Sequence, residues 1–110
     1  MNIVGELKWF LGDDYAQMKF SESTRSFSVD IVMVPPAHRG QGIGATLIQH
    51  IIHLADCMGK DIYLSARPIG SYSDEKLDRL VAYYRRFGFE VIDTGLTVSY
   101  MRRQPATRRS

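Results

Sequence analysis

Residues 37–50 read AHRGQGIGATLIQH, and this stretch decides the fold because it joins a β pattern to a helical pattern through three glycines. Gly40, Gly42 and Gly44 allow a tight turn between a strand and a helix, and they leave several backbone N–H groups uncovered. The first amides of a helix have no partner within it and lie at the positive end of its dipole. The stretch therefore predicts a site for an anionic group such as a phosphate, with Arg39 as a charge beside it.

Two common nucleotide motifs do not fit this loop. A P-loop requires Gly-Lys-Ser/Thr, but Gly44 is followed by Ala45 and Thr46. A dinucleotide fingerprint requires G-x-G-x-x-G, whereas the spacing here is G-x-G-x-G. A second interpretation stays open, in which the glycines only make a tight turn.

The chain before the glycines has the alternation and β-branched content of strands. This pattern predicts three sequential antiparallel strands, over residues 3–9, 15–20 and 26–34. Turns are expected at LGDD (11–14) and SESTR (21–25), and Pro35 and Pro36 end the third strand. The chain after them becomes helical. Apolar residues then recur with a helical period up to Gly59, namely Ile43, Leu47, Ile51, Leu54, Ala55 and Met58.

The remaining segments complete an α+β domain. Residues 61–66 predict a short buried strand, so the strand, helix and strand in sequence imply a parallel, right-handed crossover. A second helix with Leu77, Leu80, Val81 and Tyr84 on its inner face ends at Gly88, and residues 89–93 and 96–103 predict a second hairpin. We expect a mixed, mostly antiparallel sheet with one parallel strand pair and two helices.

Length and composition place the chain among ordinary globular proteins. Its 110 residues, 45% hydrophobic and 24% charged, fit one domain over residues 1–103 with a flexible basic tail over residues 104–110. Of the 14 basic residues, four lie among the last nine, which leaves 10 against 12 acidic residues in the body. This balance argues against a nucleic-acid surface on the fold.

The sequence predicts neither a disulfide nor a metal site. Cys57 is the only cysteine, and we interpret it as a small buried residue. His38, His50 and His53 lack a third ligand at a zinc-like spacing. Neither a signal peptide nor a membrane-spanning apolar run is recognisable, so a cytoplasmic location is expected.

Three segments together resemble one known family. The loop Arg39-Gly40-Gln41-Gly42-Ile43-Gly44 has the form R/Q-x-x-G-x-G/A, VDIVMV (29–34) precedes it, and YYRRFGF (83–89) follows a helix. In this order they resemble the GNAT superfamily of acyl-CoA N-acyltransferases, over residues 3–102. The resemblance implies an N-acetyltransferase that carries an acetyl group from acetyl-CoA to a primary amine by direct attack in a ternary complex.

The same resemblance assigns roles to residues. It implies that residues 39–44 bind the CoA diphosphate, and that the strand edge at Met33 and Val34, splayed from the next parallel strand, binds pantetheine. Tyr84 matches the tyrosine that protonates the departing thiolate, although it can equally be a packing residue. Asp30 matches a carboxylate that deprotonates the amine, with a structural ion pair as the alternative and Glu6 as a weaker candidate.

The chain also departs from the family pattern. Leu77 and Leu80 stand where members commonly have asparagine and alanine. The usual strand and two helices ahead of the first hairpin are missing, which implies an open acceptor side. An open side suits a protein lysine or N-terminus as acceptor, or a homodimer whose second chain completes the pocket. Exposed apolar residues at Trp9 and Phe10 also favour self-association.

Two other classes of function remain open at this stage. The short chain is also compatible with a non-catalytic CoA-binding or protein-interaction module. The arginines of residues 102–110 are compatible with a regulator that attaches to an acidic partner. Arg85 and Arg86 can contact the CoA 3′-phosphate, but we interpret them as solvated charges that complement the helix dipole.

Overall fold

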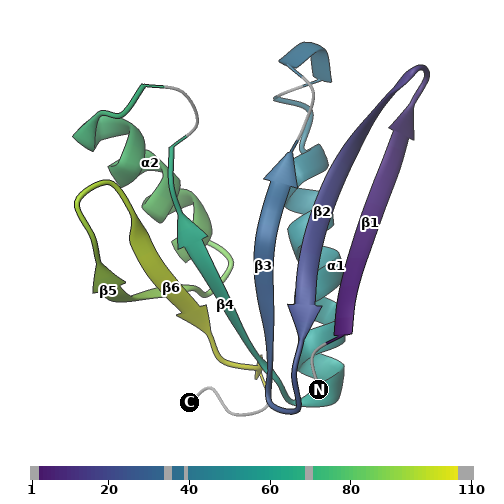
Figure 1. Ribbon diagram of the computed structural model, residues 1–110, viewed down its shortest axis with the longest axis vertical. Coiled ribbons are helices and arrows are strands. Elements are labelled where there is room, and N and C mark those ends of the chain that lie inside the picture. Colours follow the sequence, from purple (N-terminus) through teal and green to yellow (C-terminus); the bar gives the residue numbers. More distant parts are fainter. Residues whose placement is uncertain (1–2, 34–35, 39, 69–70, 107–110) are drawn as a thin grey trace.

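The computed structural model describes residues 3–33, 36–38, 40–68 and 71–106. Within these ranges the chain forms a six-stranded sheet in the order β1-β2-β3-β4-β6-β5 (Figure 1). Only β3 and β4 pair in parallel, and the other neighbours are antiparallel. The α+β prediction is therefore confirmed. The elements are β1 (Ile3–Leu11), β2 (Asp14–Glu22), β3 (Ser26–Met33), the 3-10 turn η1 (Pro36–His38), α1 (Ile43–Met58), β4 (Asp61–Ala66), α2 (Asp74–Arg85), β5 (Glu90–Thr94) and β6 (Ser99–Arg103).

Local sequence signals explain where these elements begin and end. Gly12 closes the β1–β2 hairpin with φ 71°, in the left-handed region that favours glycine. Gly59 ends α1 with φ 66°, and its backbone N–H is bonded to carbonyls of the last turn. Ser73 caps α2 through its hydroxyl, which accepts a hydrogen bond from the Lys76 backbone N–H. Gly88, at φ 95°, turns the chain from α2 toward β5.

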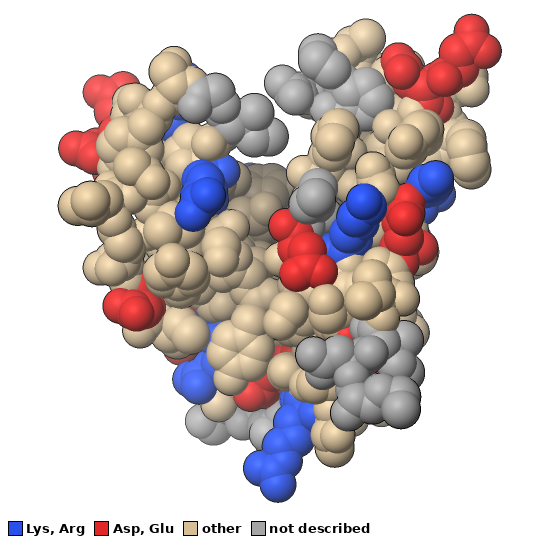
Figure 2. All heavy atoms as spheres, in the orientation of Figure 1, with Lys and Arg blue, Asp and Glu red and all other residues tan. Residues whose placement is uncertain are grey.

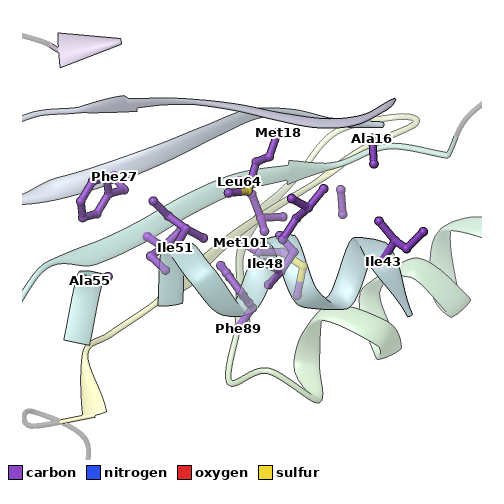
Figure 3. Packing of buried hydrophobic residues seen from close by; sticks show 13 residues of the cluster. Ala16, Met18, Phe27, Ile43, Ile48, Ile51, Ala55, Leu64, Phe89 and Met101 are labelled. Carbon is purple, nitrogen blue, oxygen red and sulfur yellow. The ribbon is translucent and has the colours of Figure 1, made fainter. Parts of the chain in front are cut away.

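Both helices lie on one face of the sheet, where the core forms (Figures 1 and 3). Helix α1 contributes Ile43, Leu47, Ile48, Ile51 and Ala55 to the core. They pack against strand residues that include Met18, Phe27, Leu64 and Met101, all at most 6% exposed. Full burial of each large apolar side chain contributes about 1.5–3 kcal/mol, so this layer is the main stabilising feature of the fold.

The opposite face of the sheet, which we call the outer face, is not covered by a helix within the described ranges. On β1 it carries Val4, Glu6, Lys8 and Phe10, all exposed, and on β2 it carries Tyr15. Lys8 Nζ lies 4.8 Å from the centre of the Tyr15 ring and 3.4 Å from a Glu6 oxygen. Among the described elements, helices therefore cover one side of the sheet only.

The first helix buries a narrower face than its period predicts. Leu54 and Met58 were expected to face inward, but they are 41% and 51% exposed, and Ile48 is buried instead. The interpretation of Cys57 as a buried residue is wrong as well, because the structure places it on the exposed side of α1, with its Sγ 3.7 Å from His53 Nε2. Ala55 in the same part of α1 is fully buried, so the helix keeps its core contact there while Leu54, Cys57 and Met58 meet solvent.

Arg103 belongs to the fold although the sequence groups it with the terminal arginines. Its side chain is 6% exposed, and two guanidinium nitrogens donate to both oxygens of Asp56, at 2.7 and 3.2 Å. Its Nε donates to the Phe87 carbonyl at 2.8 Å. In the stretch expected as a tail, Pro105 is buried and the Ala106 N–H donates to Asp56. Asp56 thus joins β6 and the start of that stretch to α1.

Candidate functional site

The parallel strands β3 and β4 separate before they end. Their pairing runs from Ser26 with Asp61 to Val29 with Leu64. Beyond this point β3 continues along β2 to Met33, and β4 continues along β6 to Ala66. The strands diverge toward their carboxyl ends (Figure 1), so the facing backbone edges no longer bond to each other. A splayed pair, which the family resemblance implied, is therefore present.

Asp30 is the extra residue of a β-bulge at the point of divergence. Phe20 pairs with Val29 but Lys19 pairs with Ile31, so Asp30 has no partner on β2. A bulge bends its strand and redirects side chains, and bulges occur frequently beside active sites. Asp30 lines the space between β3 and β4, and its carboxylate accepts a hydrogen bond from Ser21 Oγ at 3.0 Å.

A cleft of about 980 Å³ occupies this space and is lined mainly by apolar surface. The space-filling view shows the molecule hollowed between its two upper arms (Figure 2). Elements from both halves of the chain contribute residues to its lining. The described lining residues are Asp30, Val32, Met33, Gly44, Ile48, Ser65, Arg67, Pro68, Lys76, Arg79, Leu80, Tyr83 and Tyr84.

Tyr84 reaches the cleft from the last turns of α2. Its ring packs edge-on against Tyr83 and Phe89, with centroids 5.4 and 5.9 Å apart. Burial raises the pKa of the Tyr84 hydroxyl to about 12, with a smaller contribution from Tyr83. The phenol therefore stays protonated throughout the physiological pH range and can serve as a hydrogen-bond donor.

The glycine loop opens toward solvent at the start of α1. Gly40 and Gly42 have φ of 82° and 78°, and a Cβ built on either would meet no atom within 4 Å. Gly42 is the N-cap of α1, and among the described residues no side-chain hydrogen bond caps this end of the helix. The loop thus combines free donors, unoccupied space and the positive end of a 16-residue helix, which are the properties of an anion site.

The structure brings together four of the ten site residues that the sequence predicted. Asp30, Met33, Gly44 and Tyr84 line one cleft. Val34 and Arg39 lie outside the described residues. Glu6 is not among the described lining residues, and its carboxylate accepts from Gln17 Nε2 at 2.7 Å on the outer face.

Sequence reasoning missed the cationic lining of the cleft. Arg67, Lys76 and Arg79 contribute to it, whereas the sequence drew attention to Arg85 and Arg86, which lie outside it. A helical signal was available, because Arg79 lies one turn before Tyr83 and Leu80 one turn before Tyr84. Three cations and a bare helix terminus favour an anionic ligand in this region.

Other ligand classes find less support in the described part of the chain. No group of three or more His, Cys, Asp or Glu side chains there is arranged to hold a metal ion. Among the helices of the described ranges, none has the length and apolarity needed to span a membrane.

Comparisons with solved structures give the same fold. The anti-CRISPR protein AcrVA5 is 26% identical, with a TM-score of 0.64 over 89% of this chain and 97% of that one. An acyl-CoA N-acyltransferase from Pseudomonas aeruginosa is 23% identical, with a TM-score of 0.72 over 91% of this chain and 68% of that one. An aminoglycoside 6′-N-acetyltransferase solved with coenzyme A is 12% identical, with a TM-score of 0.68 over 97% of this chain and 76% of that one.

Comparisons of the sequence are consistent with this fold. A search of curated proteins gave no match. Residues 2–91 match the family described as "Acetyltransferase (GNAT) domain", and this stretch includes the glycine loop, the splayed strands and all described residues that line the cleft. The chain therefore belongs to the GNAT acetyltransferase family, whose members transfer acyl groups from coenzyme A thioesters.

Proposed function

We propose that the chain transfers an acetyl group from acetyl-CoA to a primary amine by direct attack in a ternary complex. The proposal rests chiefly on one observation: Asp30, which carries a carboxylate at a bulge, and Tyr84, which carries a partly buried, protonated phenol, both line the cleft between the splayed strands. An acceptor and a donor of protons in one partly apolar cleft suit acyl transfer, which needs both.

The residues present fit acetyl-CoA as the co-substrate. Main-chain N–H groups of residues 40–44 would bind its diphosphate, because no side chain caps this helix start and no Cβ occupies the space above Gly40 and Gly42. We assign Arg39 to the same loop. The edge of β3 at Met33 would bind pantetheine through its backbone, and we assign Val34, the next residue in the sequence, to the same contact. Arg67, Lys76 and Arg79 supply positive charge along the cleft.

Each side chain then has a defined task. Bound acetyl-CoA supplies the thioester carbonyl that the amine attacks. Asp30, directly or through one water, accepts the proton that the ammonium form of the acceptor must lose. As the new C–N bond forms and the C–S bond breaks, the sulfur retains the bonding electron pair. Tyr84 donates its O–H to that sulfur and stabilises the developing thiolate.

The acceptor that we favour is a primary amine on a macromolecule, such as a protein lysine or N-terminus. The outer face beside Asp30 is open within the described ranges, so the acceptor side lacks a wall that would enclose a small molecule. AcrVA5, which aligns over 97% of its own chain, is named an anti-CRISPR protein, and we take this as support for a macromolecular target.

Thiol release with a panel of amines, polyamines and lysine peptides tests the function. Asp30→Asn and Tyr84→Phe should slow turnover while the affinity for acetyl-CoA stays within about twofold, because neither side chain belongs to the diphosphate loop. Tyr83→Phe is the matched control, since Tyr83 lines the same cleft from the same helix without an assigned task. Acetyl-CoA binding without acceptor-dependent thiol release would instead support a non-catalytic module.

A further inference from the structure

The two edges of the sheet differ in how well they resist pairing with another chain. The β5 edge has five residues, carries Glu90 and Asp93, and is interrupted by a register shift between Val91 and Asp93. Short length, charge and bulges all discourage edge-to-edge association. The β1 edge has nine residues and pairs with β2 without a register shift from Ile3 to Leu11. It also exposes Val4 by 73% and Phe10 by 71%.

The hairpin determines which backbone groups of β1 point outward. Leu11 and Asp14 flank a two-residue turn, so they form a hydrogen-bonded pair, and such pairs recur at every second residue from there. The odd residues of β1 therefore bond to β2. The even residues direct their N–H and C=O groups away from the sheet, and these are Val4, Glu6, Lys8 and Phe10.

We infer that two copies of the chain pair through β1 as antiparallel strands, about a two-fold axis at Leu7. In this register the even residues face each other, as the outward hydrogen-bonding groups require. Glu6 lies opposite Lys8 of the second copy, and Lys8 lies opposite its Glu6. Val4 lies opposite Phe10, and Gly5 opposite Trp9. The whole strand is paired, and the two sheets become one continuous sheet.

The charges select this register over its neighbours. An axis at Glu6 would place glutamate opposite glutamate, and an axis at Lys8 would place lysine opposite lysine, which is destabilising on a sheet. An axis one residue further in either direction leaves more of the strand unpaired. An axis between two residues would place each even residue opposite an odd one, whose backbone N–H and C=O groups are already bonded to β2. The axis at Leu7 alone pairs all nine residues and both opposite charges.

The side chains of the strand are compatible with this pairing. Glu6 and Lys8 pair within one chain at 3.4 Å, and Glu6 also accepts a hydrogen bond from Gln17 Nε2. Their side-chain surfaces remain 37% and 41% exposed, so both can still contact the second copy. Gly5 has the Phe20 ring beneath it, since a Cβ there would lie 2.4 Å from Phe20 Cζ. The 40% exposed Trp9 of the second copy can cover this ring, as aromatic residues do beside strand glycines.

Light scattering with size exclusion and sedimentation at micromolar concentrations, on the full chain, tests the inference. The wild type should be a dimer. Glu6→Lys places like charges opposite each other, and so does Lys8→Glu; each should raise the dimer Kd by about tenfold or more. The double variant with both changes should recover wild-type affinity.

Mixing the two single variants provides the sharpest result. Their heterodimer pairs lysine with glutamate at every charged position, so an equimolar mixture should dimerise although each variant alone does not. Circular dichroism should show that both variants are folded. The wild type should be measured over a 100-fold range of concentrations that ends in the high micromolar range. The inference is overturned if the wild type is a monomer throughout this range. It is also overturned if the wild type forms a dimer that neither single variant weakens.

Discussion

Tyr84→Phe gives the most quantitative prediction about the candidate site. The change removes one oxygen and retains the ring, so the edge-on contacts with Tyr83 and Phe89 remain. The fold should therefore keep its stability to within about 1 kcal/mol. Any loss of activity then reports on the hydroxyl itself.

The raised pKa decides how large this loss should be. At a pKa of about 12, the Tyr84 phenol is a much weaker acid than an ordinary thiol, whose pKa is about 8.5. Complete proton transfer to the thiolate is uphill by about 5 kcal/mol, so the hydroxyl acts mainly as a hydrogen-bond donor. A hydrogen bond to a charged group contributes about 1.5–3 kcal/mol, which corresponds to a roughly 10- to 150-fold loss of kcat.

Steady-state thiol release, with calorimetry of acetyl-CoA binding, measures this effect. We expect kcat to fall by the stated factor, with Tyr83→Phe close to wild type. In the wild type, kcat should not decline between pH 8 and about pH 10, because Tyr84 holds its proton through that range. A loss below about threefold would show that Tyr84 only packs, and a loss above about 1000-fold would indicate full proton transfer instead.

Three further predictions follow from the described contacts. Asp30→Asn should lower kcat/KM at neutral pH by about 10²–10⁴-fold, with partial recovery at high pH, as measured by a pH profile of thiol release. The exposed amide of the variant can still accept a hydrogen bond from Ser21, so the fold should keep its thermal stability. A variant that loses activity because it unfolds would contradict a catalytic role. Gly42→Ala strains a residue at φ 78° by about 1–2 kcal/mol and should weaken acetyl-CoA binding in calorimetry; unchanged affinity would argue against the loop as the diphosphate site. Arg103→Ala leaves the Asp56 carboxylate without its bidentate partner and should lower the free energy of unfolding by about 3 kcal/mol in urea titrations, whereas a change below about 0.5 kcal/mol would show that the pair is not structural.

Local patterns were sufficient to predict most of the fold. Period-two alternation placed β1 to β3, and the helical period placed α1 and α2. Gly59 and Gly88 lie at the helix ends where the sequence predicts them. These features depend on a few neighbouring residues, so a single sequence contains them.

The bulge at Asp30 was not predictable, because it is a property of the pairing between β2 and β3 rather than of either strand. The sequence favoured Asp30 only through the family resemblance and left a structural role open. Phe20 pairs with Val29 and Lys19 pairs with Ile31, so Asp30 is the unpaired residue between them, and it lines the cleft.

Burial at the end of α1 was mispredicted for a related reason. Helical period gives the direction of a side chain but not how far the neighbouring sheet extends. Leu54, Cys57 and Met58 are exposed, although Ala55 between them in the sequence is fully buried. Likewise, the role of Arg103 depends on Asp56, which is 47 residues away along the chain.

Binding of the co-substrate tests the central claim most directly. Calorimetry should show coenzyme A binding to the wild type with one site per chain, and pantetheine, which lacks the diphosphate, should bind at least about tenfold more weakly. The folded chain failing to bind coenzyme A at millimolar concentration, or binding pantetheine equally well, would contradict a diphosphate site at the glycine loop.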